Sequence, residues 1–265
     1  MATGLLFSSA AFFARPLDQT FRLAAETGFS GVEVMVTKDP ASQDGGRMSR
    51  LADQHDVRIG AIHAPCLLLT RKVWGTDPVG KINRSIEVAQ EAGVPVVVVH
   101  PPYRWQISYQ RWLRDRLPEL SSDTGVIVAV ENMFPLWIGE RGLTLHANQD
   151  IEELNEMPDI VLDTSHAAVA GHDLVQMRRR FGERIRHIHL SDNAGRGWDS
   201  HLPPGEGVLD IDGFLDDLVT GGYDGDVSLE VDLRRYLTDD EKLREVMVSM
   251  RERCQERLGA PATEA

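Results

Sequence analysis

The sequence contains little cysteine and no long apolar segment. Cys66 and Cys254 are its only cysteines, and they lie far apart in the chain, so we expect two reduced thiols of a cytoplasmic protein rather than a disulfide framework. No apolar run reaches the ~18 residues that a membrane span requires. The apolar start, residues 1–14, is not preceded by basic residues and therefore does not resemble a secretory signal.

Basic residues are also scarce relative to acidic ones. The chain has 28 Lys and Arg against 41 Asp and Glu, a formal net charge of −13. Such an excess of negative charge repels polyphosphate backbones unless a local basic patch overrides it. The composition therefore argues against nucleic acid as the default partner without excluding it.

A glycine-rich dinucleotide fingerprint after the first apolar run is missing, which argues against a Rossmann fold. Instead, apolar runs of strand length alternate with longer amphipathic stretches. We expect strands at 4–8, 31–36, 57–63, 94–100, 126–131, 159–163, 185–190 and 226–231. We expect helices at 17–27, 46–55, 81–92, 106–120, 149–156, 173–181, 211–220 and 239–257.

Eight such alternations in 265 residues, of which 42% are hydrophobic, predict a parallel sheet closed into a barrel. The fold class is therefore α/β, a single (β/α)₈ TIM barrel. We expect the barrel to span residues 1–258 and to be followed by a flexible tail at 259–265.

Metal-ligand residues recur at the ends of six predicted strands. In a closed barrel these ends meet in one ring, where active sites of this fold lie. So many buried polar groups on one rim would be costly without a compensating ion, and imidazole with carboxylate suits a divalent cation. The residues are His63, His100, Glu131, Asp163, His189 and Glu230.

For several further residues, the position in the chain alone suggests a role or an environment. His187 lies two residues before His189, on the same face but one layer deeper, so we expect a structural role. Glu33 could point into the barrel mouth or face solvent. Trp105 could belong to an amphipathic helix or form a substrate wall. His55, His146 and His172 are expected at the surface.

At these positions the chain resembles the xylose-isomerase-like barrel superfamily, which comprises sugar and sugar-phosphate isomerases and epimerases together with endonuclease-IV-type repair enzymes. The resemblance covers nearly the whole chain. Its most specific segments are Val-Glu131-Asn, Leu-Asp163-Thr-Ser-His166, His-Ile-His189-Leu-Ser-Asp192, His201-Leu-Pro-Pro-Gly-Glu206-Gly and Leu-Glu230-Val.

The resemblance to the isomerases implies one divalent metal, Mn²⁺, Zn²⁺, Co²⁺ or Mg²⁺. The implied ligands are Glu131, Asp163, His189 and Glu230. Glu131 and Glu230 would exchange a proton with a small sugar-like substrate through an enediolate. The substrate-binding residues would be His166, Arg196, Glu206 and Trp105. A homo-oligomer is possible, because members of the superfamily often form dimers or tetramers.

The resemblance to the endonucleases implies a larger ligand set for three zinc ions and cleavage of abasic DNA. Its additional metal or substrate ligands would be His63, His100, His166, Asp199 and His201. A dehydratase on the same barrel is a further alternative, in which the enolate expels a hydroxyl group. The isomerase or epimerase is the leading hypothesis.

Overall fold

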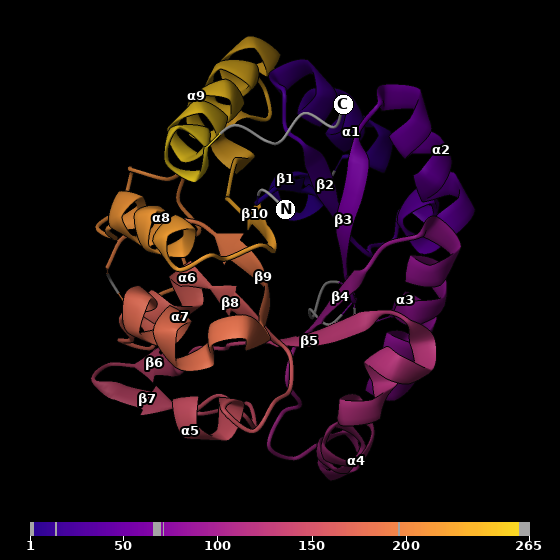
Figure 1. Cartoon of the computed structure of the whole chain (residues 1–265), viewed down its shortest axis with the longest axis vertical. Helices are drawn as coiled ribbons and strands as arrows, with labels where there is room; N and C mark the ends of the chain where they lie inside the picture. The colour runs from indigo at the N-terminus through magenta and orange to yellow at the C-terminus, as the bar shows by residue number, and fades with distance from the viewer. Residues whose placement is uncertain (1–2, 14, 66–69, 71, 196, 260–265) are drawn as a thin grey trace.

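The computed structural model describes residues 3–13, 15–65, 70, 72–195 and 197–259. Its centre is a closed barrel of parallel strands in the order β1-β10-β9-β8-β5-β4-β3-β2, surrounded by helices (Figure 1). The predicted TIM barrel is thus confirmed. The strands are β1 Leu5–Ser8, β2 Gly31–Met35, β3 Arg58–His63, β4 Val96–Val99, β5 Ile127–Glu131, β8 Ile160–Asp163, β9 Ile185–Leu190 and β10 Asp226–Leu229.

The helices follow the strands in the predicted alternation. Gly28 and Gly93 end α1 and α3 in the left-handed conformation, which glycine adopts without a steric penalty. Within the described residues, no helix combines the length and apolar character needed to cross a membrane. The helices are α1 Leu17–Thr27, α2 Gly45–His55, α3 Pro78–Ala92, α4 Ile107–Thr124, α5 Ile151–Leu154, α6 Thr164–Val169, α7 Leu174–Phe181, α8 Ile211–Thr220 and α9 Asp240–Leu258.

Helix α6 and the strands β6 (Leu136–Ile138) and β7 (Arg141–Leu143) were not predicted. Helix α6 follows β8 at once, because the Asp163 carboxylate accepts a hydrogen bond of 2.7 Å from the backbone N–H of His166 and caps the helix. Strands β6 and β7 form a small antiparallel hairpin beside the barrel. Each hairpin strand has three residues, too few to produce a recognisable alternation.

The barrel interior changes from apolar to polar along the strands. Ala61, Val98 and Val161 belong to a small buried apolar cluster. Glu33 and His187 are both fully buried, so Glu33 does not face solvent. The register pairs Val161 with His187 and Asp163 with His189. His187 therefore lies one inward-facing layer below the strand ends, as predicted.

His146 is buried, so its predicted surface position was wrong. Only 8% of the residue is exposed. Its Nδ1–H donates to the carbonyl of Pro101 over 2.9 Å, and the Tyr103 ring stacks on it at 4.3 Å. Burial lowers the pKa of His146 to about 4. His55 and His172 are half-buried.

The buried His146 predicts a pH dependence of stability. Its folded-state pKa of about 4 lies below the ordinary value of 6.5, so the unfolded chain binds the proton first as the pH falls. Protonation should therefore remove on the order of 3 kcal/mol between pH 6.5 and pH 4. His146→Asn cannot take up this proton, so its free energy of unfolding, measured with urea, should fall less over this range. Parallel curves for the two proteins would contradict the prediction.

Candidate metal centre

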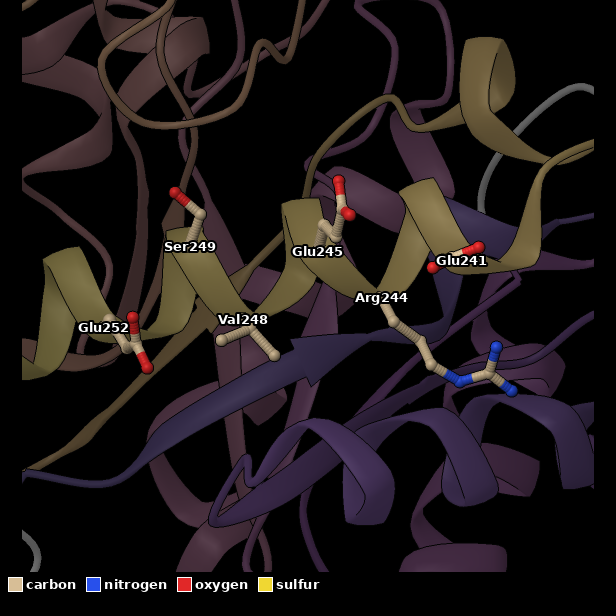
Figure 2. A pocket seen from close by; sticks show the side chains of 6 residues that line it. All are labelled: Glu241, Arg244, Glu245, Val248, Ser249 and Glu252. Carbon is tan, nitrogen blue, oxygen red and sulfur yellow. The ribbon is translucent and has the colours of Figure 1, made fainter.

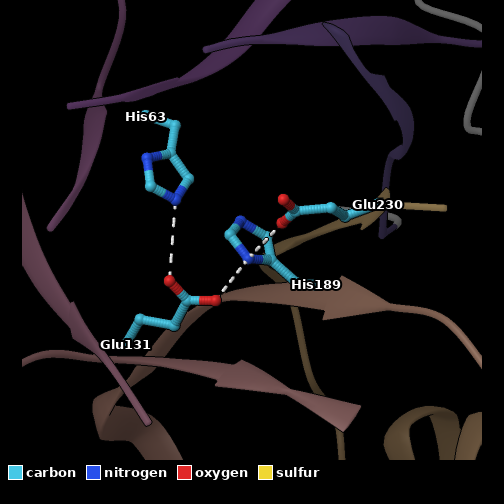
Figure 3. Close-up of side chains that lie close together, drawn as sticks. All are labelled: His63, Glu131, His189 and Glu230. Carbon is cyan, nitrogen blue, oxygen red and sulfur yellow. Dashed lines mark hydrogen bonds and ion pairs between the residues drawn. The ribbon is translucent and has the colours of Figure 1, made fainter. Parts of the chain in front are cut away.

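Three carboxylates converge on one imidazole nitrogen at the carboxyl ends of the barrel strands. His189 Nδ1 lies 3.0 Å from Glu131 Oε1 and 2.8 Å from Glu230 Oε2, as Figure 3 shows. It also lies 3.8 Å from Asp163 Oδ2. Strands β5, β8 and β9 carry Glu131, Asp163 and His189, and Glu230 directly follows β10. The four residues predicted from the resemblance therefore lie on one rim. Glu131, His189 and Glu230 share a set of close ligand atoms, and Asp163 lies at its edge, in a neighbouring group.

The spacing and the unpaired atoms of this group fit a divalent cation. Nitrogen and oxygen ligands bound tetrahedrally at about 2.1 Å lie roughly 3.4 Å apart. A single Nδ1–H can serve one acceptor well, not three. Within the described part of the chain, three buried carboxylate oxygens of this group lack a well-aligned hydrogen bond, although imidazole nitrogens lie 2.8 Å and 3.0 Å from two of them. Such oxygens are unusual without an ion. They are Glu131 Oε2, Asp163 Oδ2 and Glu230 Oε2.

The electrostatics of the group favour a positive charge at this point. Burial alone lowers the pKa of His189, but the carboxylates of Glu33, Glu230 and Glu131 outweigh it and raise the pKa well above its usual value. Burial raises the pKa of Asp163 to about 6. Without metal, a proton on His189 thus balances the carboxylates, whereas a metal needs the neutral imidazole, so the two compete.

His63 and His100 extend the group on the side of Glu131. His63 Nδ1–H donates to the carbonyl of Ala64 over 3.0 Å, and its Nε2 lies 3.6 Å from Glu131 Oε2. His100 Nε2 approaches the same oxygen at 3.0 Å, and the hydroxyl of Tyr109 donates to the His100 carbonyl. His63, Glu131, His189 and Glu230 offer ligand atoms that lie within 4.8 Å of one another.

A second candidate group consists of Asp163, His166 and His201, whose ligand atoms also lie within 4.8 Å. The Nδ1–H groups of the two histidines donate over 2.9 Å to the carbonyls of Asn132 and Glu230. Their Nε2 atoms then face Asp199 Oδ2 at 3.4 Å and 2.8 Å. Both nitrogens are oriented as metal ligands would be.

The backbone at His201 is strained. Its φ of 40° lies in the left-handed region, which a non-glycine residue adopts at a cost. Burial lowers the pKa of His201, but Asp199 raises it to about 10. Ser165 Oγ donates to the other oxygen of Asp199 over 2.6 Å. The loop after β9 is therefore held so that Asp199 and His201 face the strand ends.

Asp192 organises this loop, a role that the sequence analysis missed. The residue is fully buried, and its two carboxylate oxygens accept backbone hydrogen bonds of 2.8 to 3.0 Å from Asn193, Gly205, Gly207 and Leu209. A Cβ at Gly207 would lie 2.2 Å from Asp192 Oδ1, so only glycine fits there. In the sequence, the glycines of this loop were the feature that pointed to such close backbone contacts.

The remaining predicted residues lie outside these two groups. Glu206 is exposed and pairs with Arg235. Trp105 is 66% exposed and stacks on Tyr103 with ring centroids 4.6 Å apart. Arg196 lies outside the described residues. Substrate binding by these three side chains therefore stays a prediction.

A surface depression along α9 holds none of the predicted site residues. Its lining is largely charged, and Arg244 in it donates to Glu26 of α1 over 2.7 Å. It belongs to the outer helical layer (Figure 2), and we assign no chemistry to it. The lining residues are Glu241, Arg244, Glu245, Val248, Ser249 and Glu252.

The chain belongs to the family of xylose isomerase-like TIM barrels, whose profile matches residues 21–253. An uncharacterized protein of Mycobacterium leprae (strain TN) is 35% identical over 246 residues, which cover 84% of this chain and 87% of the relative. The fructoselysine 3-epimerase of Shigella flexneri is 21% identical over 82% of this chain and 85% of that enzyme.

A solved structure of a D-tagatose 3-epimerase-like protein matches with a TM-score of 0.67 and 26% identity, over 94% of this chain and 99% of the other. The predicted membership of the superfamily is confirmed. An epimerase is thus among the relatives in sequence, and an epimerase-like protein is among the similar structures.

The Asp192 contacts predict a large effect of a small substitution. Asp192→Asn should lower the free energy of unfolding by about 2–3 kcal/mol, because its amide NH₂ would face backbone N–H donors that now bind a carboxylate oxygen. Urea denaturation measures this loss. Asp210→Asn is the matched control, since exposed Asp210 caps α8 with one hydrogen bond to Gly213 and asparagine caps equally well. Equal losses in the two variants would refute the role of Asp192.

Proposed function

We propose that the protein is a divalent-metal-dependent isomerase or epimerase of a small sugar or sugar phosphate, acting by proton transfer through an enediolate. The observation that carries this proposal is the convergence on His189 Nδ1 of three carboxylates, of which Glu131 and Asp163 are buried. The epimerases among its relatives support the choice of reaction. The small number of cysteines is consistent with a cytoplasmic location.

Glu131, Asp163, His189 and Glu230 would hold the metal. When bound, a divalent ion supplies Lewis acidity to a substrate carbonyl and its neighbouring hydroxyl. Mn²⁺, Zn²⁺, Co²⁺ and Mg²⁺ are all compatible with a set of three carboxylates and one imidazole. Each carboxylate has two acceptor oxygens, so it could both bind the ion and take part in proton transfer.

Glu131 and Glu230 would move the proton. They approach His189 Nδ1 from different strands (Figure 3), so a substrate carbon between them would have a carboxylate on each face. One carboxylate would take the proton from carbon. The other, in its protonated form, would donate a proton to the opposite face for epimerisation, or to the adjacent carbon for isomerisation. His166, at the start of α6, would orient a hydroxyl group.

Glu131 and Glu230 differ in solvent exposure, and this difference suggests which of them meets the substrate first. The Glu131 side chain is 1% exposed and lies within 3.6 Å of His63, His100, His166 and His189. The Glu230 side chain is 15% exposed. Solvent, and therefore substrate, reaches Glu230 more readily. We expect Glu230 to make the first contact with the substrate carbon.

Replacement of either glutamate by glutamine should remove turnover while the fold persists. Glutamine keeps the size but cannot accept the proton, so kcat should fall at least 10²-fold, as for the loss of other general bases. The assay is conversion of a ketose and aldose panel, followed by chromatography and by deuterium uptake from D₂O. Glu140→Gln, on the exposed hairpin turn, is the control. Full activity in Glu131→Gln and Glu230→Gln would exclude these roles.

A metal-dependent phosphodiesterase is the second candidate function. Its support is the second ligand group, in which His166 and His201 present Nε2 to Asp199. Together with His63 and His100, these residues provide enough ligands for more than one ion. When bound, zinc would supply Lewis acidity for hydrolysis of a phosphodiester.

Metal content distinguishes the two candidates. The leading proposal predicts close to one divalent ion per chain after purification without added metal, measured by elemental mass spectrometry. About three zinc ions per chain, with cleavage of a duplex that contains an abasic site, would establish the phosphodiesterase instead. A product lighter by one water would indicate a dehydratase. A protein that neither holds nor responds to metal would contradict all three.

A further inference from the structure

We propose that Glu33, buried beneath the candidate metal centre, is a positioning residue that fixes the tautomer of His189 and so selects Nδ1 as its metal-binding atom. This inference rests on the proposed metal site, but it concerns a residue that lies outside the set of ligands. The sequence alone did not decide whether the Glu33 side chain points into the barrel mouth or faces solvent.

Glu33 is an acceptor for three buried donors. Its Oε2 receives hydrogen bonds from His189 Nε2 at 3.0 Å and from His187 Nε2 at 2.6 Å. Its Oε1 receives one from Ser8 Oγ at 3.2 Å. Glu33, His187 and His189 are all fully buried. An ionised carboxylate has no proton to donate, so each nitrogen that faces it must carry the hydrogen.

Without metal, Nδ1 of His189 also faces carboxylates and carries a hydrogen of its own. A metal would displace the hydrogen on Nδ1, while the Glu33 carboxylate keeps the one on Nε2. Nδ1 is then the ring atom whose lone pair becomes free. Nδ1 is also the atom on which Glu131, Asp163 and Glu230 converge. Glu33 therefore directs the lone pair of His189 toward the metal position. A carboxylate behind a metal-bound histidine also raises the basicity of the ligand.

Three other histidines of the site use the opposite arrangement. His63, His166 and His201 donate Nδ1–H to the backbone carbonyls of Ala64, Asn132 and Glu230, and they present Nε2. His189 has no such backbone contact among the described residues, and a side chain from another strand takes its place. Replacement of this one side chain can thus change the tautomer without altering the backbone.

The strand register and the neighbouring side chains hold the Glu33 carboxylate in a defined position. Its register partners are Ser8 on β1 and Ala61 on β3, and a register shift between Val32 and Glu33 adjusts β2 to β3. His187 lies one inward-facing layer below His189 on β9 and donates to the same oxygen. The carboxylate is consequently held by neighbours on two sides of the barrel.

The test compares Glu33→Gln with wild type and with Ser8→Ala. Glutamine keeps the size of the side chain but can turn its NH₂ group toward Nε2 and favour the wrong tautomer. Ser8→Ala removes the hydrogen bond to Oε1, together with the one that Ser8 Oγ accepts from the backbone N–H of Ala10, and it leaves Oε2 in place. Zinc affinity, measured by competition with a chromophoric chelator, should fall 10- to 100-fold in Glu33→Gln and less than about 3-fold in Ser8→Ala.

The second readout is the nitrogen that binds zinc, identified from ¹⁵N shifts of the imidazole rings in the zinc-loaded protein. A purely structural role would not move this signature. Wild type should show His189 ligated through Nδ1 with a protonated Nε2, and Glu33→Gln should lose this pattern. Ligation of wild-type His189 through Nε2 would overturn the inference even if Glu33→Gln did not fold.

The outcomes separate this inference from the proposed function. Unchanged zinc affinity and Nδ1 ligation in Glu33→Gln would refute the positioning role and leave the metal site intact. A wild-type protein that binds no zinc, manganese, cobalt or magnesium would refute the proposed function, and the inference with it.

Discussion

The mutual repulsion of buried carboxylates at the barrel mouth is the constraint on which the rest of this structure depends. Glu131, Asp163 and Glu230 approach one nitrogen of His189, each with an oxygen that no described donor satisfies. Buried charge of one sign is expensive unless an opposite charge accompanies it. A proton on His189 supplies one positive charge for three carboxylates, and a divalent ion supplies two.

Closure of the barrel makes this concentration of charge possible. The four residues come from β5, β8, β9 and the end of β10, and parallel strands bring their carboxyl ends to one rim. Hydrogen bonds between neighbouring strands fix the relative heights. The Asn132 side chain, for example, bonds both to the N–H and to the carbonyl of Asp163. A shift of β8 relative to β5 would break both hydrogen bonds.

The strand ends could be predicted from the sequence, because an apolar run followed by a ligand-type residue is a local signal. The interactions that orient those ligands could not. Glu33 and His189 are 156 residues apart, and their contact depends on the register of β2, including the irregularity after Val32. Likewise, the N–H groups that bind Asp192 come from up to 17 residues later in a loop without periodicity.

His146 and helix α6 illustrate two other limits. Nothing in the residues around His146 distinguishes a buried from an exposed imidazole, because its partners, Tyr103 and the Pro101 carbonyl, come from the loop after β4. Helix α6 has only six residues and begins inside a segment that also supplies ligands. Its formation depends on the Asp163 carboxylate, which caps it through Oδ1 and faces His189 through Oδ2.

The position of Asp163 links the two candidate ligand groups and bears on how many ions the site can hold. One of its oxygens lies 3.8 Å from His189 Nδ1, and the other lies 3.9 Å from His166 Nδ1. His166 Nδ1, however, already donates to the Asn132 carbonyl, so only its Nε2, facing Asp199, remains for a metal. A second ion would therefore lie on the side of Asp199 and His201, away from His189. In a one-metal isomerase, the same two histidines and Asp199 would instead be free to bind the hydroxyl groups of a sugar.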